Sequence, residues 1–409
     1  MLEAIQEAIW VEILARLPLR SIARFKSVCK NWKSVIESSY FRRLFISLHR
    51  NSSSSWSLMF ESSLPHPITE AIGFHGCKKW DLPKPPSSYI MPLQRYPNLP
   101  ASKFRYVASS NGLVLIEAIP DHSANKSFVG NPVLQQWVEI PPLSTSTSQP
   151  VCPVCLFRTS GLVTRVEEDG LVSSFKVLTT CEMFRPREKR VYVYSSETGL
   201  WTFKRLVLNK AGFSPTENHS GVHYTWESDS DDFGQLEFVA HDFYGPEDDD
   251  QWRVLTLPPL PSNRRPRRCL TASRGGVVCM EVLDRVLKVW KLKDSSNSDG
   301  ECWHLSREAI NMASVGFDVD CSPLGANPFD SDMVYLWSLQ HGCLVSGNLQ
   351  KQEFAVCQES DISSSSAGSW VVNTLDSKGC MESFKETSVL MLSQFVLLQW
   401  MGPVPRPPN

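Results

Sequence analysis

Few residues of this 409-residue chain have both the type and the spacing that covalent or metal chemistry requires. Cys152 and Cys155 stand in a Cys-Pro-Val-Cys arrangement, a spacing at which two thiolates can share a zinc ion. A structural zinc site needs a second pair of ligands, and the sequence offers none at a matching spacing. His241 and Asp242 have the types for acid–base work, but no nucleophile or further carboxylate can be paired with them. We therefore expect no catalytic residue, no metal site and no cofactor.

Charge and composition narrow the classes of partner. The formal net charge is −2, whereas nucleic-acid binding usually leaves a strong basic balance, so we expect no nucleic acid partner. The basic cluster RRPRR at 264–268 has two interpretations, an import signal or acidic-partner site and a solvated loop, of which the second is favoured. The first residues carry three glutamates where a signal peptide has a basic region, and the apolar run VLMLSQFVLLQW is too short to span a bilayer. We expect no membrane association and a location in the cytoplasm, the nucleus or both.

The chain opens with a small helical module. Apolar residues spaced by four predict a helix over 3–16, and the Leu17-Pro18 pair ends it, because proline disfavours helical geometry in the residue before it. A second short helix is expected around Ile22 and a third around Trp32, closing near Phe41. Three short helices form only a small core, yet this segment carries large apolar side chains on more than one face. Two interpretations stay open: a cap packed on the rest of the chain, or a docking surface for a partner.

Beyond a serine-rich connector, short β-rich runs alternate with turn residues, and an aromatic position recurs. Intervals of 57, 64, 51, 51 and 51 residues separate the recurring positions, which are Trp80, Trp137, Trp201, Trp252, Trp303 and Phe354. A period near 50 with three or four strands per unit is typical of a kelch-type β-propeller. Six units predict a closed ring, in which strands after Phe354, including FVLLQW, pair with the first blade. The alternative is a pair of β-sandwiches with coincidental spacing.

The stretch EILARLPLRSIARFKSVCKNW resembles the F-box, especially its plant form. F-boxes bind the Skp-type adaptor of cullin-based ubiquitin ligases, so the resemblance implies an adaptor and, through it, a cullin as partners. Carried over by position, it implies that seven residues form or support the adaptor-binding surface: Leu14, Leu17, Pro18, Ile22, Val28, Cys29 and Trp32. One departure stands out, because the family usually opens with Leu-Pro and this chain has Ile5-Gln6.

The later segments SSNGLVLIE, VGNPVLQQWVEIPP, VYVYSSETGLW and LKVWKLKD resemble the F-box-associated domain of plant F-box/kelch proteins. The expected architecture is α+β and multidomain: a three-helix F-box (1–48), a linker (49–60), a kelch-like, six-bladed β-propeller (61–400) and a proline-rich tail (401–409). The resemblance implies a non-catalytic substrate receptor of a Skp–cullin–F-box ubiquitin ligase that holds a target protein on its propeller. A binding scaffold without a ligase and a propeller enzyme remain the alternatives.

Overall fold

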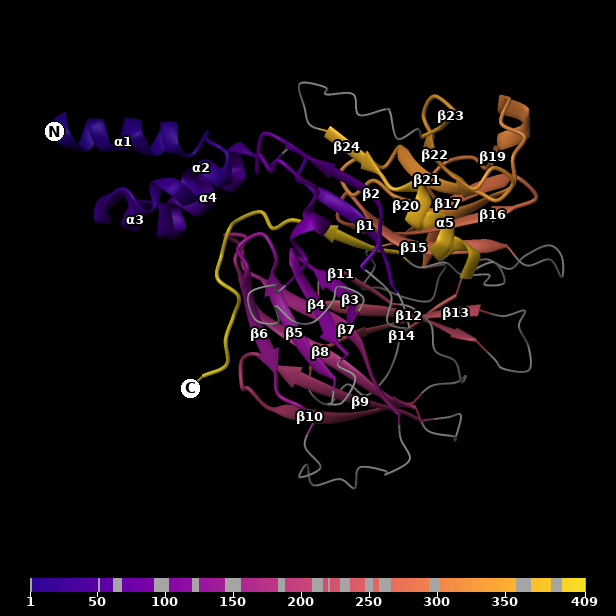
Figure 1. Cartoon of the computed structure of the whole chain (residues 1–409), viewed down its shortest axis with the longest axis horizontal. Coiled ribbons are helices and arrows are strands. Elements are labelled where there is room, and N and C mark those ends of the chain that lie inside the picture. The colour runs from indigo at the N-terminus through magenta and orange to yellow at the C-terminus, as the bar shows by residue number, and fades with distance from the viewer. Residues whose placement is uncertain are drawn as a thin grey trace.

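The computed structural model places a helical module beside a ring of β-sheets (Figure 1). The parts of the chain that it describes are residues 2–50, 52–61, 68–91, 103–119, 125–143, 156–182, 188–207, 216–219, 221–228, 236–246, 253–256, 266–293, 302–357, 369–383 and 392–408.

The helical module contains four helices, α1 (Leu2–Leu14), α2 (Leu19–Phe25), α3 (Lys30–Glu37) and α4 (Ser39–Leu48). The third predicted helix is thus divided in two at Ser38. Ser38 has extended backbone angles, and its side chain accepts a hydrogen bond from the backbone N–H of Phe41 (3.2 Å), so it caps the helix that follows. Pro18 is extended as well and precedes α2, as its fixed φ angle favours.

Six sheets of antiparallel strands make up the ring, which confirms the predicted six-bladed propeller. The closing sheet has the order β24 (Ser369–Val372), β2 (Glu70–His75), β1 (Trp56–Phe60), β25 (Leu392–Val396). The other five sheets are formed by β3 (Phe104–Ser110), β4 (Leu113–Ala118), β5 (Lys126–Asn131) and β6 (Gln136–Ile140); by β7 (Leu156–Val166), β8 (Val172–Glu182), β9 (Glu188–Ser195) and β10 (Trp201–Val207); by β11 (Thr216–His219), β12 (Val222–Ser228), β13 (Leu236–Asp242) and β14 (Arg253–Leu255); by β15 (Arg267–Ser273), β16 (Gly276–Leu283), β17 (Val286–Leu292), β18 (Trp303–Leu305) and β19 (Ile310–Asn311); and by β20 (Cys321–Ala326), β21 (Met333–Ser338), β22 (Cys343–Asn348) and β23 (Glu353–Val356). Short helices η1 (Pro86–Tyr89), η3 (Met312–Val315) and α5 (Thr374–Ser383) lie between strands.

The ring closes through strands from both parts of the chain, as the sequence predicts. β25 pairs with β1 from Trp56↔Val396 to Phe60↔Leu392, and β24 pairs with the other edge of β2. Strand β1 therefore takes up the last five residues of the segment expected as a linker, because Trp56–Phe60 are all buried in the closing sheet.

Polar side chains hold the inner strands together at the centre of the ring. The Gln394 side-chain amide on β25 donates to Thr271 Oγ1 (2.7 Å) and to the Ala326 carbonyl (2.6 Å), which lie on β15 and β20. Ser109 on β3 donates to the Gln394 backbone carbonyl (3.0 Å). Hydrogen bonds among four different blades thus satisfy buried polar groups that would otherwise be costly.

The recurring aromatic residues mark the outermost strands, with one exception. Trp137, Trp201 and Trp303 lie at or next to the first residue of β6, β10 and β18, and Phe354 is the second residue of β23. Trp252 lies outside the described residues. Trp80 instead follows β2 in a turn, and the outermost strand of the closing blade carries Trp370. The error arose because that strand comes from near the end of the chain.

Candidate adaptor-binding surface

Helix α1 carries apolar residues on two faces. Val11, Leu14 and Ala15, which are related by helical spacing, are buried against the rest of the chain. On the other face Ile9 and Ile13 are 55% and 46% exposed, and Trp10 is 45% exposed. Ile9 and Ile13, whose spacing predicted this helix from the sequence, are therefore exposed. The buried side of the helix is formed by the second set, Val11, Leu14 and Ala15.

Further apolar side chains lie in the turn before α3 and at its start. Val28 is 63% exposed, and Trp32 is half-buried with its ring 6.2 Å from that of Trp10. The Cys29 side chain is exposed and accepts a hydrogen bond from the Trp32 backbone N–H (3.5 Å), so it caps α3. Together five residues form what we call the α1–α3 apolar face: Ile9, Trp10, Ile13, Val28 and Trp32. An exposed cluster of this kind usually marks an interaction surface.

The seven residues expected at the adaptor fall into three groups. Leu14 and Ile22 are buried in the chain's own core, so they can only support the surface from below. Half-buried positions form the second group, Leu17, Pro18 and Trp32, and exposed positions the third, Val28 and Cys29. Sequence reasoning did not assign Ile9, Trp10 and Ile13 to the surface, although two overlapping apolar stripes on one short helix were the available signal.

The Gln6 position lies within α1, which begins at Leu2. A proline at a helix interior position removes a backbone donor and clashes with the preceding turn. Glutamine therefore permits a helix that extends further toward the N-terminus than Leu-Pro would favour.

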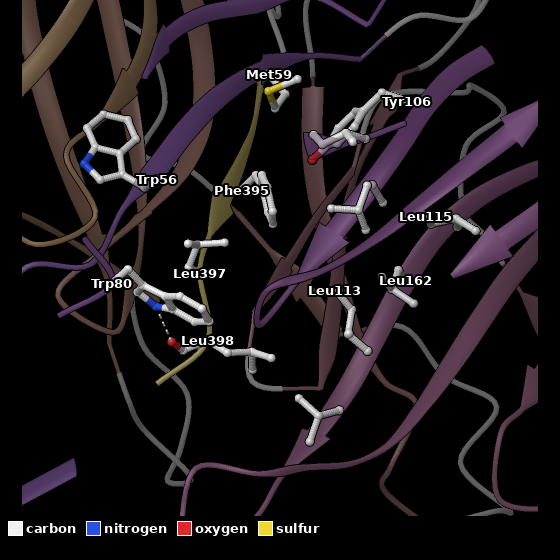
Figure 2. Packing of buried hydrophobic residues seen from close by; sticks show 14 of the residues in the cluster. Trp56, Met59, Trp80, Tyr106, Leu113, Leu115, Leu162, Phe395, Leu397 and Leu398 are labelled. Carbon is white, nitrogen blue, oxygen red and sulfur yellow. Dashed lines mark hydrogen bonds between the residues drawn. The ribbon is translucent and has the colours of Figure 1, made fainter. Parts of the chain in front are cut away.

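The opposite side of the helical module packs on the propeller. Phe41 and Phe45 of α4 have ring centroids 5.9 and 5.3 Å from that of Trp400, in edge-to-face geometry. The Leu19 backbone N–H donates to the Lys79 carbonyl (2.8 Å). Trp80, beside Lys79, donates its indole N–H to the Leu398 carbonyl (3.1 Å; Figure 2). A single continuous hydrophobic core therefore joins the helices to the ring.

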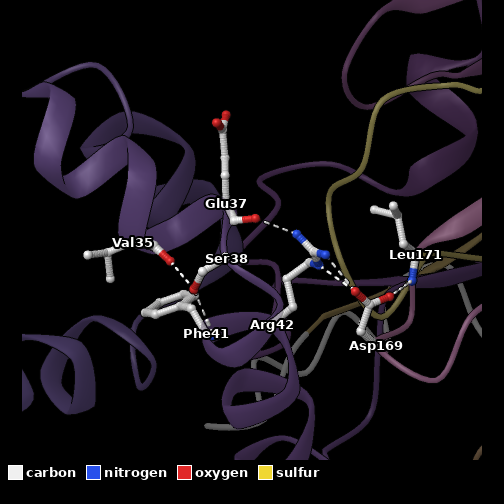
Figure 3. Close-up of polar contacts among 7 residues, drawn as sticks. All are labelled: Val35, Glu37, Ser38, Phe41, Arg42, Asp169 and Leu171. Atoms are coloured by element: carbon white, nitrogen blue, oxygen red, sulfur yellow. Dashed lines mark hydrogen bonds and ion pairs between the residues drawn. The ribbon is translucent and has the colours of Figure 1, made fainter.

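An ion pair reinforces this junction (Figure 3). Arg42 of α4 donates from Nε (2.9 Å) and Nη2 (2.6 Å) to Asp169 Oδ2, in the turn between β7 and β8. Burial acts to raise the pKa of Asp169, but hydrogen bonds from Arg42 and from the Leu171 backbone outweigh it and hold that pKa below its ordinary value. In the adjoining turn residue, Gly170, an added Cβ would lie 2.5 Å from Ile46 Cδ1, which shows how closely α4 approaches the ring.

A buried lysine lies at the same junction. Lys79 is 0% exposed, and its ammonium donates to Gln399 Oε1. Burial lowers the pKa of Lys79 to about 8. The nearby His49 donates from Nε2 to the Ala15 carbonyl (3.1 Å), and burial lowers the pKa of His49 as well.

The residues considered for catalysis have structural surroundings. His241 is buried in β13, with its ring 4.6 Å from that of Phe243, and Asp242 Oδ1 accepts from the Tyr244 backbone N–H (2.8 Å). Within the described ranges, no three His, Cys, Asp or Glu side chains are grouped so as to hold a metal. Cys152 and Cys155 lie outside the described residues.

The basic cluster at 264–268 is not a wholly solvated loop. Arg264 and Arg265 lie outside the described residues, but Arg267 and Arg268 belong to β15. Arg268 is buried and donates to Glu281 Oε2 from Nε (2.9 Å) and Nη2 (2.8 Å), so the favoured interpretation was wrong at this residue. The charge of Arg268 is paired with that of Glu281 inside the blade.

Residues 54–406 match the family model "F-box protein At3g26010-like, beta-propeller", and residues 5–44 match the F-box domain. The chain belongs to this family of F-box propeller proteins. The Arabidopsis thaliana F-box protein At1g49990 is 52% identical over 98% of this chain and 97% of its own length. F-box protein At3g26010 is 39% identical over 98% and 91%, and putative F-box/kelch-repeat protein At4g22430 is 38% identical over 98% and 93%.

Family membership confirms the resemblance that the sequence motifs carried. An F-box implies binding to a Skp-type adaptor, and F-box propeller proteins are typically non-catalytic adaptors. No helix in the described part of the chain is long and apolar enough to cross a membrane.

Proposed function

We propose that this protein is the substrate receptor of a Skp–cullin–F-box ubiquitin ligase. The F-box docks on the adaptor through the α1–α3 apolar face, and the propeller holds a target protein. The observation that carries the proposal is the division of the helical module into two sides. One side is sealed on the ring by Phe41, Phe45 and Trp400, whereas the other leaves Ile9, Trp10, Ile13 and Val28 exposed.

The continuous core between the F-box and the ring supports this role. A receptor contributes proximity, because it holds target lysines near a charged ubiquitin-conjugating enzyme and so raises their effective concentration. A docked F-box keeps the target-binding surface at one orientation relative to the ligase. The target surface is expected on the side of the ring away from the F-box, where β7 and β25 begin, since the segments that follow these two strands contact α4 at Gly170 and Trp400.

The test is co-purification of the full chain with a Skp-type adaptor, followed by addition of a cullin. Ile13→Asp and Val28→Asp place a charge on the α1–α3 apolar face at exposed positions, so folding is preserved. Each is expected to weaken adaptor binding at least tenfold, which corresponds to about 1.4 kcal/mol. Leu17 and Pro18 are poorer choices, because both are half-buried in the chain's own core.

Leu200→Asp is the matched control, since Leu200 is 65% exposed and lies in the turn between β9 and β10. It should bind the adaptor as wild type does. Failure of the wild-type chain to bind would overturn the proposal and leave a ligase-free scaffold. Equal binding by Ile13→Asp and Val28→Asp would show that the adaptor uses another surface.

A further inference from the structure

The proline-rich tail is seated on the propeller. Met401, Gly402 and Val404 are buried. An added Cβ on Gly402 would lie 2.5 Å from Leu171 Cδ1, and one on Gly199 would lie 2.9 Å from Pro407. The tail therefore runs from the junction with the F-box past β6 to the turn between β9 and β10.

From Pro403 to Arg406 the exposed residues are three apart, and the period ends there, because Pro407 is half-buried and Pro408 is exposed. Pro403 and Arg406 are exposed, whereas the residues between them, Val404 and Pro405, are buried and half-buried. A polyproline II helix has three residues per turn, so one residue per turn faces solvent and two face the protein. Proline at 403, 405, 407 and 408 favours this backbone.

The groove beneath the tail is formed by the start of β6. Gln136 Oε1 accepts the one hydrogen bond that ties the tail to this groove in the described structure, from the Val404 backbone N–H (3.3 Å). A cavity of about 350 Å³ remains there, lined by residues 136–138 of the strand and 403–406 of the tail. The tail thus occupies the groove without filling it.

Trp137, in this groove, has an unused hydrogen-bond donor. The residue is 5% exposed, and its Nε1 meets no acceptor among the described residues. The corresponding tryptophans of two other blades behave differently: Trp201 Nε1 donates to the Pro141 carbonyl (2.9 Å) and Trp303 Nε1 to the Leu255 carbonyl (3.5 Å). A buried N–H without an acceptor is costly, so its retention calls for an explanation.

We propose that the β6 groove is a docking site for a proline-rich segment of another protein, and that the chain's own tail is its intramolecular occupant. Polyproline II segments are recognised by aromatic-lined grooves, and their fully solvated carbonyls accept hydrogen bonds from donors in the groove. Trp137 supplies the aromatic wall and the free donor, and Gln136 supplies an acceptor for the backbone N–H of a non-proline residue, as it does for Val404 in the tail. A partner segment that reaches the indole N–H makes a contact that the tail does not make. It must also compete with the high effective concentration of a covalently linked tail.

The proposal is tested on the full chain with fluorescein-labelled decaproline as the probe. Val404→Asp puts a charge in the buried position of the tail and should open the groove. Fluorescence anisotropy should then show saturable decaproline binding to Val404→Asp, and at least tenfold weaker binding to wild type. Arg406→Ala, at an exposed tail position, is the matched control and should behave as wild type.

The indole donor is tested by adding Trp137→Phe to Val404→Asp, which keeps an aromatic ring and removes the N–H. Affinity for decaproline should fall about fivefold, as expected for one lost neutral hydrogen bond. If Val404→Asp fails to fold, Pro405→Gly with Pro407→Gly opens the groove by loosening the tail backbone instead. The proposal is overturned if the opened, folded variants bind no decaproline, or if Trp137→Phe leaves their affinity unchanged.

Discussion

Replacing Lys79 with methionine tests how the junction between F-box and propeller is held. The Lys79 side chain is fully buried beside Gln399, and its pKa falls from an ordinary value of 10.5 to about 8. The native state holds this proton less tightly than the unfolded chain does. The free energy of unfolding is therefore lowered at every pH at which the unfolded lysine is protonated. The stability of the wild type should therefore rise as pH rises from 8 toward 10.5.

The magnitude follows from that difference in pKa. One pKa unit is worth about 1.4 kcal/mol, so the penalty is about 3 kcal/mol at pH 7 and between roughly 1 and 2 kcal/mol at pH 9.5. Methionine fills a similar volume without charge but loses the hydrogen bond to Gln399, which costs about 1 kcal/mol. Lys79→Met should therefore be more stable than wild type by about 2 kcal/mol at pH 7 and by little at pH 9.5.

Thermal unfolding of both proteins at several pH values measures this difference. An unfolding entropy of about 2.1 cal/mol/K per residue gives about 0.9 kcal/mol/K for 409 residues, so Lys79→Met should raise Tm by about 2 °C at pH 7. Comparing the two proteins at each pH cancels the titration of all other groups. A Tm difference that stays constant from pH 7 to 9.5, or a Lys79→Met protein that is less stable at pH 7, would refute a buried, charge-penalised lysine.

Two further predictions concern the same junction. Arg42→Met leaves the Asp169 carboxylate without its ion-pair partner and should lower the unfolding free energy by about 1–2 kcal/mol at pH 7. This loss of stability should vanish as pH falls through the lowered pKa of Asp169. A loss that persists in acid would contradict an electrostatic origin. Trp400→Ala removes the ring on which Phe41 and Phe45 pack and should lower the unfolding free energy by about 3–5 kcal/mol. In the variant, amide hydrogen exchange in α4 should become faster than in β8. Equal protection of α4 in the variant and the wild type would show that the F-box does not depend on this contact.

Much of the architecture was predictable because it depends on local patterns. A recurring aromatic residue near the start of four outermost strands revealed the blades, and the apolar run at 395–400, of which Phe395 and Val396 lie in β25, anticipated closure of the ring. The misassignment of Trp80 has a physical cause, since the closing blade takes its outermost strand, with Trp370, from a distant part of the chain. No periodicity along the sequence reports such a pairing.

The candidate surface was less predictable than the fold. Leu14 and Ile13 are neighbours with similar side chains, yet one is buried and the other is 46% exposed. The inward-facing stripe of α1 belongs to the same core as Phe45 and Trp400, and Trp400 is far away in the sequence. The Trp137 donor was equally hidden, because the motif that contains it marks only a blade-packing position.

Closure of the ring by β25 has a consequence for synthesis. The F-box and β1 leave the ribosome first, but β1 lacks its inner neighbour, and α4 lacks Trp400, until almost the entire polypeptide has emerged. Throughout translation the nascent chain exposes an unpaired strand edge and the rings of Phe41 and Phe45, and chaperones bind surfaces of both kinds. A chain that ends before β25 cannot bury these groups, so the quality-control machinery of the cell can distinguish it from the complete protein.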